Sequence, residues 1–486
     1  MKKTIVFNPF TRVEGDLQIE VEIANGVVTE ARTSGTLYRG FENILRGRTP
    51  SDAIVLTGRI CGSCGGTHAA AASAALADAY GVKPPANGLL ARNVILGVET
   101  ILSHLSHFYL SFCVDFAAES EAGARVGAAP QEARKRFAPL EGSSYRAAVK
   151  ARSGLTAILG LFAGKWPNTL AMQPGGATRP VTRSELLRAV GVLSEFREFV
   201  EERMLGDALE GWLENRAFAA VERWLGIGAH ANSDVGLFLS LAAQHGFEKL
   251  GRGPARFLSS GGWPLPDGKA WLRSGFFDGE VRRCDPDQIS EHVRYSWYQS
   301  YAGGRRPIEG VSDPAPEKEG AYSWCKAPRY SGEPVEVGPL ARLVIDRDQL
   351  IVDLFDRFGS VVLTRMLARL HEMIRLVVQI EVWLKGINPE EPFYVKDAPK
   401  DTAIGCGLVE APRGMLGHWV QIEKGRIRNY QVVTPTGWNL SPRDEQGRPG
   451  PLEAALVGVP VTDPERPLTL SHTVRSYDPC LFCTVH

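Results

Sequence analysis

The sequence predicts an α+β protein that is mainly helical, with a large central helical bundle and small β-sheet elements near both ends. Three observations predict this fold class. The N-terminal residues alternate between apolar and polar side chains, long stretches after residue 66 have helical spacing, and no repeat or flexible linker interrupts the 486 residues. A prior of about 150 residues per domain allows about three domains. Without linkers, however, we expect one domain over residues 1–486.

The N-terminal β part covers about residues 1–35. Apolar residues alternate with polar ones over residues 17–23, which predicts a strand with one buried face. Asn25-Gly26 predicts a tight hairpin turn, and Val27 begins the return strand. The apolar run within residues 1–7 does not have the form of an export signal, so we expect an edge strand there.

Four long segments carry a helical pattern. The first is rich in alanine and ends before Gly81. The third opens with the capping box Thr182-Arg183-Ser184-Glu185, and the last is stopped by Gly386 and Pro389. We expect helices over His68–Tyr80, Leu89–Phe116, Thr182 to about Leu205, and about Gln349 to Lys385.

Two segments outside these helices have other patterns. Residues 250–340 are rich in glycine, proline and aromatic residues, and we expect an ordered irregular loop there. Trp419–Ile422 and Ile427–Val433 flank Lys424-Gly425, which predicts a second hairpin.

The composition argues against several functional classes. Lys+Arg and Asp+Glu both number 55, so the zero net charge gives no reason to expect a nucleic-acid or anionic-membrane partner. Hydrophobic residues make up 44% and charged residues 23%, which is ordinary for globular proteins. No stretch reaches the roughly 18 apolar residues of a membrane span. We therefore expect no signal peptide or transmembrane segment on this chain, and a cytoplasmic or cytoplasmic-membrane-associated location.

Four of the eight cysteines form two C-x-x-C pairs at opposite ends of the chain. Cys61 and Cys64 make the first pair, and Cys480 and Cys483 make the second, which begins 416 positions after Cys64. Thiolates at this spacing converge on one ion and select zinc, iron–sulfur clusters or other thiophilic metals. A redox dithiol needs only one pair and a βαβ context. Structural zinc sites usually join pairs close in sequence, so we favour a catalytic metal centre that joins the chain ends.

The motifs around both pairs resemble those of a known family. R-x-C-G-x-C-x-x-x-H from Arg59 to His68, with D-P-C-x-x-C-x-x-H from Asp478 to His486, is similar to the large subunit of nickel–iron hydrogenases. The resemblance covers essentially the whole chain and implies the hydrogenase large-subunit fold. Further matching segments are Thr11–Gly15, Tyr38–Glu42, His107–Tyr109 with Asp115, Lys326–Tyr330, Glu336–Arg342, Ala411–Gly414 and Thr434–Asn439.

By this resemblance, all four cysteines bind nickel. Cys64 and Cys483 would also bridge to an iron that carries two cyanides and one carbon monoxide, Fe(CN)2(CO), whereas Cys61 and Cys480 would be terminal ligands. Four polarizable thiolates suit nickel in several oxidation states. The implied reaction is the reversible heterolytic cleavage of H2 to two protons and two electrons, with the Cys480 thiolate as the first base.

The resemblance also implies an arginine beside the metals. Arg413 follows Pro412 in a tight turn, and its five fixed donors suit hydrogen bonding to a cyanide nitrogen. Asp115 and Asp478 are expected to orient the guanidinium. From the residues alone, an ordinary buried ion pair between Arg413 and Asp115 is the alternative.

Three further residues receive roles by resemblance. Glu14 would be the next proton carrier, although a surface salt bridge with Arg12 is the simpler interpretation of the residue alone. His68 would hydrogen-bond a bridging sulfur, and its alternative is an ordinary histidine early in a helix. Thr436 would hydrogen-bond a cyanide, and its alternative is a turn hydroxyl that caps the next element.

A second, redox-inert metal is expected near the C-terminus. Glu42 and His486 would be its side-chain ligands, Val432 would provide a carbonyl oxygen, and Glu336 would lie nearby through water. Oxygen ligands fit magnesium, and the histidine also permits Fe2+. The alternative for Glu42 is a surface salt bridge with Arg39.

The resemblance implies several partners. The other cysteines have no cluster-binding spacing and are expected to be buried hydrophobes: Cys113, Cys284, Cys325 and Cys406. Electrons therefore require a small subunit that carries iron–sulfur clusters. Because the chain stops three residues after Cys483, a maturation protease and nickel-insertion proteins are implied, and heterodimers could assemble into a higher oligomer.

The subtype follows from length and from single positions. The length and the segment from Gly35 to Glu42 are most like the shorter uptake and hydrogen-sensing group. Sensors commonly carry Gln where this chain has His68, which favours an uptake enzyme over a low-turnover sensor. A nickel-free, complex-I-like subunit and a structural zinc protein are further alternatives. The chain departs from the family pattern in the small residues Gly65-Gly66-Thr67, in Gly437 and in Asn168.

Overall fold

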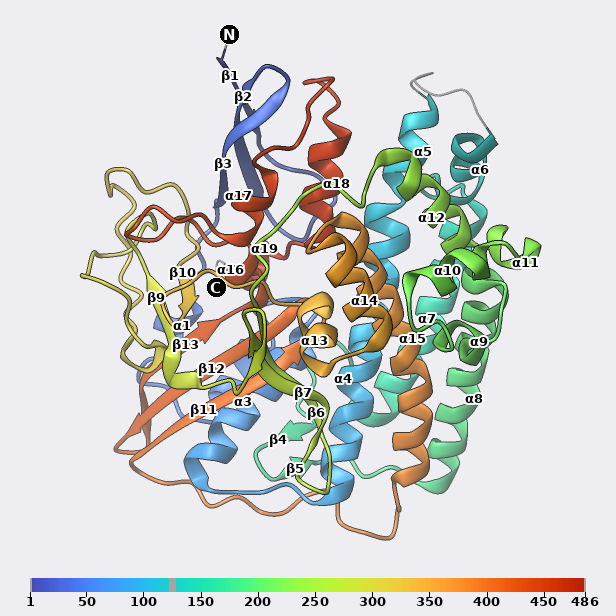
Figure 1. Ribbon diagram of the computed structural model, residues 1–486. Coiled ribbons are helices and arrows are strands. Elements are labelled where there is room, and N and C mark those ends of the chain that lie inside the picture. The colour runs from blue at the N-terminus through green and yellow to red at the C-terminus, as the bar shows by residue number, and fades with distance from the viewer. Residues whose placement is uncertain (1, 122–127, 485–486) are drawn as a thin grey trace.

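The computed structural model describes residues 2–121 and 128–484. Helices gather on one side of the molecule, and sheets with long loops lie on the other (Figure 1). The strands are β1 (Lys2–Phe7), β2 (Leu17–Ala24), β3 (Val27–Gly35), β4 (Met172–Gln173), β5 (Gly176–Ala177), β6 (Phe257–Pro264), β7 (Ala270–Phe277), β8 (Val281–Arg282), β9 (Ile289–His292), β10 (Ala327–Tyr330), β11 (Ala403–Ala411), β12 (Gly414–Glu423) and β13 (Arg426–Val433).

The helices outnumber the strands, which confirms the expected mainly helical α+β class. They are α1 (Phe41–Leu45), α2 (Asp52–Thr57), α3 (Gly65–Tyr80), α4 (Ala86–Ser106), α5 (Val114–Glu121), α6 (Ala128–Phe137), α7 (Ser143–Ala163), α8 (Arg183–Phe199), α9 (Leu209–Leu213), α10 (Phe218–Leu225), α11 (Gly228–Ala231), α12 (Asp234–His245), α13 (Pro339–Asp346), α14 (Gln349–Phe358), α15 (Val362–Gly386), α16 (Pro435–Asn439), α17 (Pro451–Leu456), α18 (Leu468–Ser476) and α19 (Leu481–Thr484). None of the helices in the described residues is long and apolar enough to cross a membrane.

The N-terminal sheet is antiparallel in the order β1-β2-β3, with β1 at its edge as expected. The alternating apolar residues of β2 are all buried: Leu17, Ile19, Val21 and Ile23. Asn25 and Gly26 both have positive φ, 54° and 77°, which is the conformation of a tight I′ hairpin turn. The predicted first hairpin is therefore confirmed.

The helical bundle is built around α4, which is buried along nearly its whole length. Helix α4 packs against α15 and α7, and α7 packs against α8. The predicted capping box at Thr182 is present, and α8 continues into a π-helical turn that ends at Leu205. The helix predicted to end at Phe116 instead contains the π-helical turn His107–Phe112 between α4 and α5. Such π-turns recur at functional sites.

Two predictions about secondary structure are wrong. The helix expected from Gln349 to Lys385 is divided into α14 and α15, because Gly359 has φ 78° and turns the chain out of the helix. Residues 250–340 contain the strands β6 to β10 rather than only irregular loop. Glycines in these strands interrupt the alternation of apolar and polar side chains by which a strand is recognised. Gly275 of β7 is one example, and a Cβ there would lie 2.9 Å from the Ile345 side chain of α13.

The sheet β11-β12-β13 contains the predicted second hairpin and one strand that the sequence did not reveal, β11. Helix α3 packs closely across β11. A Cβ at Gly407 would lie 2.2 Å from the Ala71 carbonyl oxygen, and one at Gly405 would lie 2.0 Å from that of Ala75. The alanine-rich stretch and these glycines therefore bring two backbones together beside the first cysteine pair.

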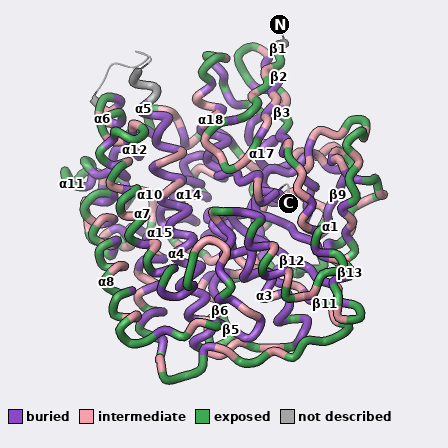
Figure 2. Tube along the Cα trace, turned by 180° about the vertical axis from the view of Figure 1, so that it is seen from behind, coloured by how far each residue is buried: buried purple, intermediate pink, exposed green. Residues whose placement is uncertain are grey.

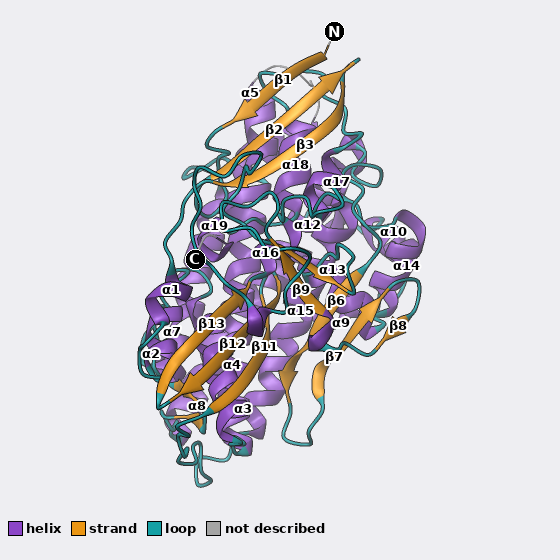
Figure 3. Cartoon of the chain, turned by 90° about the vertical axis from the view of Figure 1, so that its left-hand side faces the viewer, coloured by secondary structure: helices purple, strands orange, loops and turns teal. Residues whose placement is uncertain are grey.

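The two ends of the chain meet inside the molecule. Glu14 forms an isolated parallel bridge with Cys480, and the Leu481 amide donates to the Glu14 carbonyl at 2.6 Å. Figure 2 shows the C-terminal end among buried segments, and Figure 3 shows it between the N-terminal sheet and β11–β13. The fold thus carries both C-x-x-C motifs into one buried region.

Candidate metal centre

The two cysteine pairs converge on one point. The four sulfur atoms all lie within 4.8 Å of one another, and all four residues are buried. The Sγ–Sγ distances are 3.4 Å for Cys61–Cys480, 3.1 Å for Cys64–Cys483 and 3.1 Å for Cys480–Cys483. These exceed the about 2.05 Å of a disulfide bond. The geometry instead suits four sulfurs that share one or two metal ions.

Local structure orients each pair. Cys61 lies in the loop after α2, and Cys64 is the N-cap of α3. Cys480 precedes α19, and Cys483 lies within it. Arg39 connects the two motifs because its guanidinium donates to the carbonyl of Ile60, at 2.5 Å, and to that of Phe482. The sequence predicts for Arg39 only a surface salt bridge with Glu42, because its position beside both cysteine motifs depends on the tertiary structure.

The electrostatics of the cluster favour a cation. Hydrogen bonds from the neighbouring thiols hold the pKa of Cys61 well below its ordinary value. The hydrogen bond with Cys480 raises the pKa of Cys64, and burial raises that of Cys483. A metal ion can displace the protons of the neutral thiols. The resulting thiolates then bind the metal, which compensates their negative charge. The donor set therefore fits the nickel–iron group that the motifs imply.

Arg413 projects from a two-residue turn onto this cluster. β11 ends at Ala411 and β12 begins at Gly414, so Pro412 and Arg413 form the turn itself. The Arg413 guanidinium donates through Nε to the Asp478 carbonyl at 2.8 Å and pairs through Nη2 with the Asp478 carboxylate at 3.0 Å. Although burial lowers the pKa of Arg413, Asp478 and the cysteines outweigh it and hold the pKa well above its ordinary value. Arg413 is therefore a permanent buried cation beside the sulfurs.

Arg342 holds the same turn from behind. Its buried guanidinium donates to the carbonyl of Ala411 at 2.7 Å and to that of Pro412 at 3.3 Å. It also pairs with Glu372 at 2.6 Å and Glu410 at 2.9 Å. Arg342 ends one of the segments that resemble the hydrogenase family, and the sequence predicts no role for it. These contacts make it the support of the Arg413 turn.

A small cavity lies beside Cys64 and Cys483. Its volume is about 10 Å³, about the space that one water molecule needs. Its lining comprises Cys64, His68, Ala411, Pro412, Arg413, Leu416, Pro435, Thr436 and Cys483. Two sulfurs, one cation and a hydroxyl thus face a mostly apolar space. This chemistry suits a compact, electron-rich group bound to the sulfurs and hydrogen-bonded at its edge.

A wider cleft of about 860 Å³ lies beside the residues that flank the cluster. Glu14, Ser63, Arg413, Asp478 and Trp166 are among its lining residues. The Glu14 side chain lines this cleft and is partly open to solvent. Desolvation by the surrounding protein raises the pKa of its carboxyl above the ordinary value. Arg413 lowers this pKa, and Cys61 raises it. A carboxyl with a raised pKa at this position can both accept and release a proton.

Comparisons with known proteins agree with this site. A family model described as nickel-dependent hydrogenase matches residues 39–142 and 140–486. The chain belongs to the nickel-dependent hydrogenase family. This hydrogenase chain is 34% identical to the large subunit of the periplasmic [NiFeSe] hydrogenase of Desulfomicrobium baculatum, over 100% of this chain and 95% of the relative. It is 30% identical to the hydrogenase-1 large chain of Escherichia coli K12, with the same coverage.

Solved structures show the same fold. The Ni-Fe-Se hydrogenase of D. vulgaris Hildenborough in its reduced state superposes with a TM-score of 0.88 at 33% identity, covering 100% of both chains. The chain is thus a hydrogenase large subunit, an oxidoreductase whose nickel–iron centre belongs at the four-cysteine cluster.

Asp115 does not lie where the hydrogenase resemblance led us to expect. It pairs with Arg475 at 2.6 Å and also with Arg12, whereas Asp478 is the carboxylate that pairs with Arg413. The expected Asp115–Arg413 contact is replaced because Arg12 and Arg475 bracket the aspartate. Arg475 also donates to the carbonyl of Thr11 at 2.8 Å, so Asp115 helps hold the segment that carries Glu14.

His68 and Thr436 both line the small cavity. The His68 Nδ1 atom lies 3.2 Å from Nε2 of His418, whose Nδ1 is 2.8 Å from the Tyr430 hydroxyl. The Thr436 hydroxyl accepts the Cys480 amide at 3.1 Å. Thr434, not Thr436, caps α16, so the simple capping alternative for Thr436 does not hold.

The expected second metal site is a buried polar cluster. Glu42 accepts the Val432 amide at 2.8 Å, and Lys326 Nζ lies 3.2 Å from Glu42 and 3.5 Å from Glu291. Two buried carboxylates facing one ammonium leave a net negative charge, which is unfavourable without a further cation. The donors present therefore fit a divalent cation. His486 lies outside the described residues.

Glu336 lies elsewhere, which corrects the sequence-based expectation. Its carboxylate pairs with Arg365 at 2.9 Å and accepts hydrogen bonds from Ser360 at 2.7 Å and Tyr477 at 3.1 Å. Glu291 occupies the place beside Glu42 that we had assigned to Glu336. Its signal was hidden because Glu291 stands in the segment interpreted as irregular loop, which is in fact β9.

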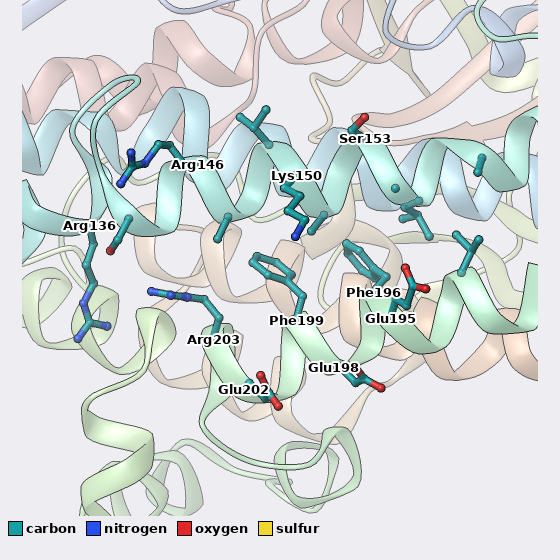
Figure 4. A pocket seen from close by; sticks show the side chains of 18 of the residues that line it. Arg136, Arg146, Lys150, Ser153, Glu195, Phe196, Glu198, Phe199, Glu202 and Arg203 are labelled. Atoms are coloured by element: carbon teal, nitrogen blue, oxygen red, sulfur yellow. The ribbon is translucent and has the colours of Figure 1, made fainter.

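Another groove of this hydrogenase chain lies apart from the cysteines, between α7 and α8. It measures about 1160 Å³, and Figure 4 shows Lys150 of α7 directed toward Phe199 of α8. Charges of both signs line it, including Arg146, Arg203 and Glu195. This mixture selects no ligand class, so the groove is not part of the candidate site.

Proposed function

We propose that this chain is the catalytic subunit of an uptake hydrogenase, which oxidises H2 and passes electrons to an iron–sulfur small subunit. The observation that carries the proposal is the buried four-sulfur cluster, which has the Arg413 cation close by and lies near a cleft lined by Glu14. Heterolytic cleavage needs a metal site, a fixed positive charge and a group that carries a proton. The four cysteines, Arg413 and Glu14 can provide these in turn.

The cysteines have different proposed roles. Cys61 and Cys480 would be terminal nickel ligands, and Cys64 and Cys483 would hold both nickel and an iron that carries diatomic ligands, Fe(CN)2(CO); the small cavity lies beside these last two cysteines. When bound, the nickel–iron pair supplies the electrophilic site and the electron reservoir for H2 cleavage. Arg413, Thr436 and His68 line that cavity; Arg413 and Thr436 would donate hydrogen bonds to the cyanides, and His68 would support the sulfur environment.

The proton leaves through two groups of this chain. The Cys480 sulfur accepts it first, and the Glu14 carboxyl passes it to water in the cleft. The backbone bridge between Glu14 and Cys480 keeps these two residues adjacent. Asp478 fixes the guanidinium of Arg413 next to the sulfurs, whereas Asp115 acts indirectly by holding Arg12 and Arg475.

The second metal is proposed as Mg2+, with Fe2+ as the alternative. Glu42, the Val432 carbonyl and His486 would hold it, and Glu291 replaces Glu336 as the nearby carboxylate. The excess buried negative charge around Lys326 supports this assignment.

The proposed assembly contains other proteins. A small subunit with iron–sulfur clusters accepts the electrons, and nickel-insertion proteins and a maturation protease complete the centre. A higher oligomer of heterodimers is compatible with this arrangement. We place the enzyme in the cytoplasm or at the cytoplasmic membrane, and cell fractionation tests this because one relative is named periplasmic.

One set of measurements tests the function. The purified protein should contain nickel and iron and show cyanide and carbonyl infrared bands. Zinc without these bands would contradict the proposal. Steady H2-dependent dye reduction separates an uptake enzyme from an H2-sensing hydrogenase with low turnover. His68 favours the uptake enzyme because sensors of the resembled family commonly carry Gln at this position.

A further inference from the structure

Helix α3 begins at a metal-ligand position and therefore lacks an ordinary cap. The first N–H groups of any helix have no partner within it, and a side chain at the N-cap usually accepts one of them. The N-cap of α3 is Cys64, which makes no side-chain cap hydrogen bond, because its sulfur points into the four-sulfur cluster. Another group must satisfy the start of α3.

Glu99 of α4 fills this role from across the helix pair. One carboxylate oxygen accepts the Gly66 amide at 2.9 Å, and the other accepts the Thr67 amide at 2.8 Å. The Thr67 hydroxyl donates at 2.6 Å and the Trp166 indole N–H at 2.8 Å. Glu99 is fully buried. Four donors thus converge on the Glu99 carboxylate. The first of them, the Gly66 amide, stands two residues after the proposed metal ligand Cys64.

The small residues after Cys64 are shaped for this contact. A Cβ at Gly66 would lie 2.6 Å from the Glu99 Oε2 atom, and a Cβ at Gly65 would lie 2.6 Å from the Gly58 carbonyl oxygen. Gly65-Gly66-Thr67 departs from the family pattern by its small size. The Glu99 carboxylate therefore occupies the space that a side chain at position 66 would fill.

Neutral groups compensate the carboxylate. Within residues 2–121 and 128–484, no ion pair involves Glu99, and its four hydrogen bonds come from amides, a hydroxyl and an indole. The positive end of the α3 dipole adds to them. The charge therefore lies close to Cys64 without a screening cation.

We propose that Glu99 is a positioning residue for the metal centre, capping α3 in place of Cys64 and linking the Cys64 loop to Trp166 on the cleft wall. This inference rests on the proposed nickel–iron function. Glu99 holds Cys64 at the helix start and His68 one turn later in fixed orientation toward the small cavity. Its negative charge also raises the electron density at the neighbouring sulfur.

Glu99→Gln is the decisive substitution. A carboxylate accepts four hydrogen bonds, whereas the amide NH2 of Gln only donates and would face at least one of the four donors. We expect the amides of Gly66 and Thr67 to exchange with deuterium faster in the purified holoenzyme. We expect nickel loss to a chelator to accelerate roughly 5- to 30-fold, the factor that corresponds to one lost buried hydrogen-bond partner. The carbonyl infrared band should shift to higher wavenumber because negative charge is removed.

Glu453→Gln is the matched control. Glu453 is also buried, and its carboxylate accepts the Thr33 amide and the Tyr322 hydroxyl, both at 2.9 Å. The control should leave nickel retention and the infrared bands at wild-type values. A double-mutant cycle with Trp166→Phe adds a second readout, because removing the indole donor should partly rescue Glu99→Gln.

Each result decides between the alternatives. Wild-type amide exchange, nickel retention and infrared bands in Glu99→Gln would overturn the inference. If Glu99→Gln does not fold, Thr67→Val removes one donor to the same carboxylate and must produce the same changes at smaller size; unchanged values in that variant also reject the inference. Wild-type protein that contains zinc and lacks cyanide bands would instead reject the proposed function, while amide exchange would still report on the cap.

Discussion

The Arg413 guanidinium and the Asp478 carboxylate form a buried ion pair with an Nη2–Oδ1 distance of 3.0 Å. Arg413 stands in the β11–β12 turn, and Asp478 lies two residues before Cys480. Arg369 contacts the other carboxylate oxygen at 3.3 Å. Although burial acts in the opposite direction, Arg413 and the other nearby cationic groups lower the pKa of Asp478 to about 2. The pair joins the central hairpin to the C-terminal cysteine motif.

Arg413→Lys should lower H2-dependent dye reduction by about 10²- to 10³-fold, the usual cost of losing a preorganised donor. Lysine keeps the positive charge. Its single ammonium lacks the planar, forked donors with which arginine can contact Asp478 and the cavity at the same time. Turnover and nickel content measured on the same preparation check this. Arg273→Lys, at an exposed arginine, is the control. Full turnover in Arg413→Lys would rule out the role of the guanidinium.

Glu14→Gln should preserve the metal centre but slow proton exchange with solvent by about 10²- to 10⁴-fold, since the amide cannot carry a proton. Isotope exchange between D2 and water, recorded with the infrared spectrum, measures both effects. The exposed Asp16 provides the control Asp16→Asn, which should behave as wild type. Unchanged exchange in Glu14→Gln would reject this carboxyl as the proton gate.

Arg342→Met should destabilise the folded protein by about 3–5 kcal/mol, because Glu372 and Glu410 would lose their buried cation. Their charges cannot be hydrated in the interior. The free energy of unfolding, from denaturant titration, checks this value. Arg282→Met at an exposed site should change it by less than about 0.5 kcal/mol. Equal stability of the two variants would contradict the buried network.

The buried Glu453 carboxyl should make the free energy of unfolding depend on pH. Burial raises its pKa to about 7 in the folded protein, compared with about 4.3 in an unfolded chain. The folded state therefore favours the protonated carboxyl. This contribution is fully present below about pH 4.3 and is lost as the pH rises through 7, and it amounts to about 4 kcal/mol. Glu453→Gln should flatten the decline in unfolding free energy between pH 5 and 8; a parallel decline in both proteins would contradict it.

Local structure was accessible from the sequence where one short pattern dominates. The alternation over residues 17–23, the turn at Asn25-Gly26 and the capping box at Thr182 all appear as predicted. Each depends on neighbours within a few residues. The same reasoning missed the break at Gly359 and the strand β11, where packing against distant elements decides the conformation.

The candidate site divides in the same manner. The sequence alone determined the four cysteines, their grouping into two pairs and the resemblance to a nickel–iron site, because thiolate chemistry and C-x-x-C spacing are local properties. Only the tertiary structure decided that Asp478 rather than Asp115 pairs with Arg413, that Glu291 rather than Glu336 lies beside Lys326, and that Glu99 caps α3. These contacts join residues between 32 and 65 positions apart. They depend on how helices and strands pack in three dimensions, which no local pattern records.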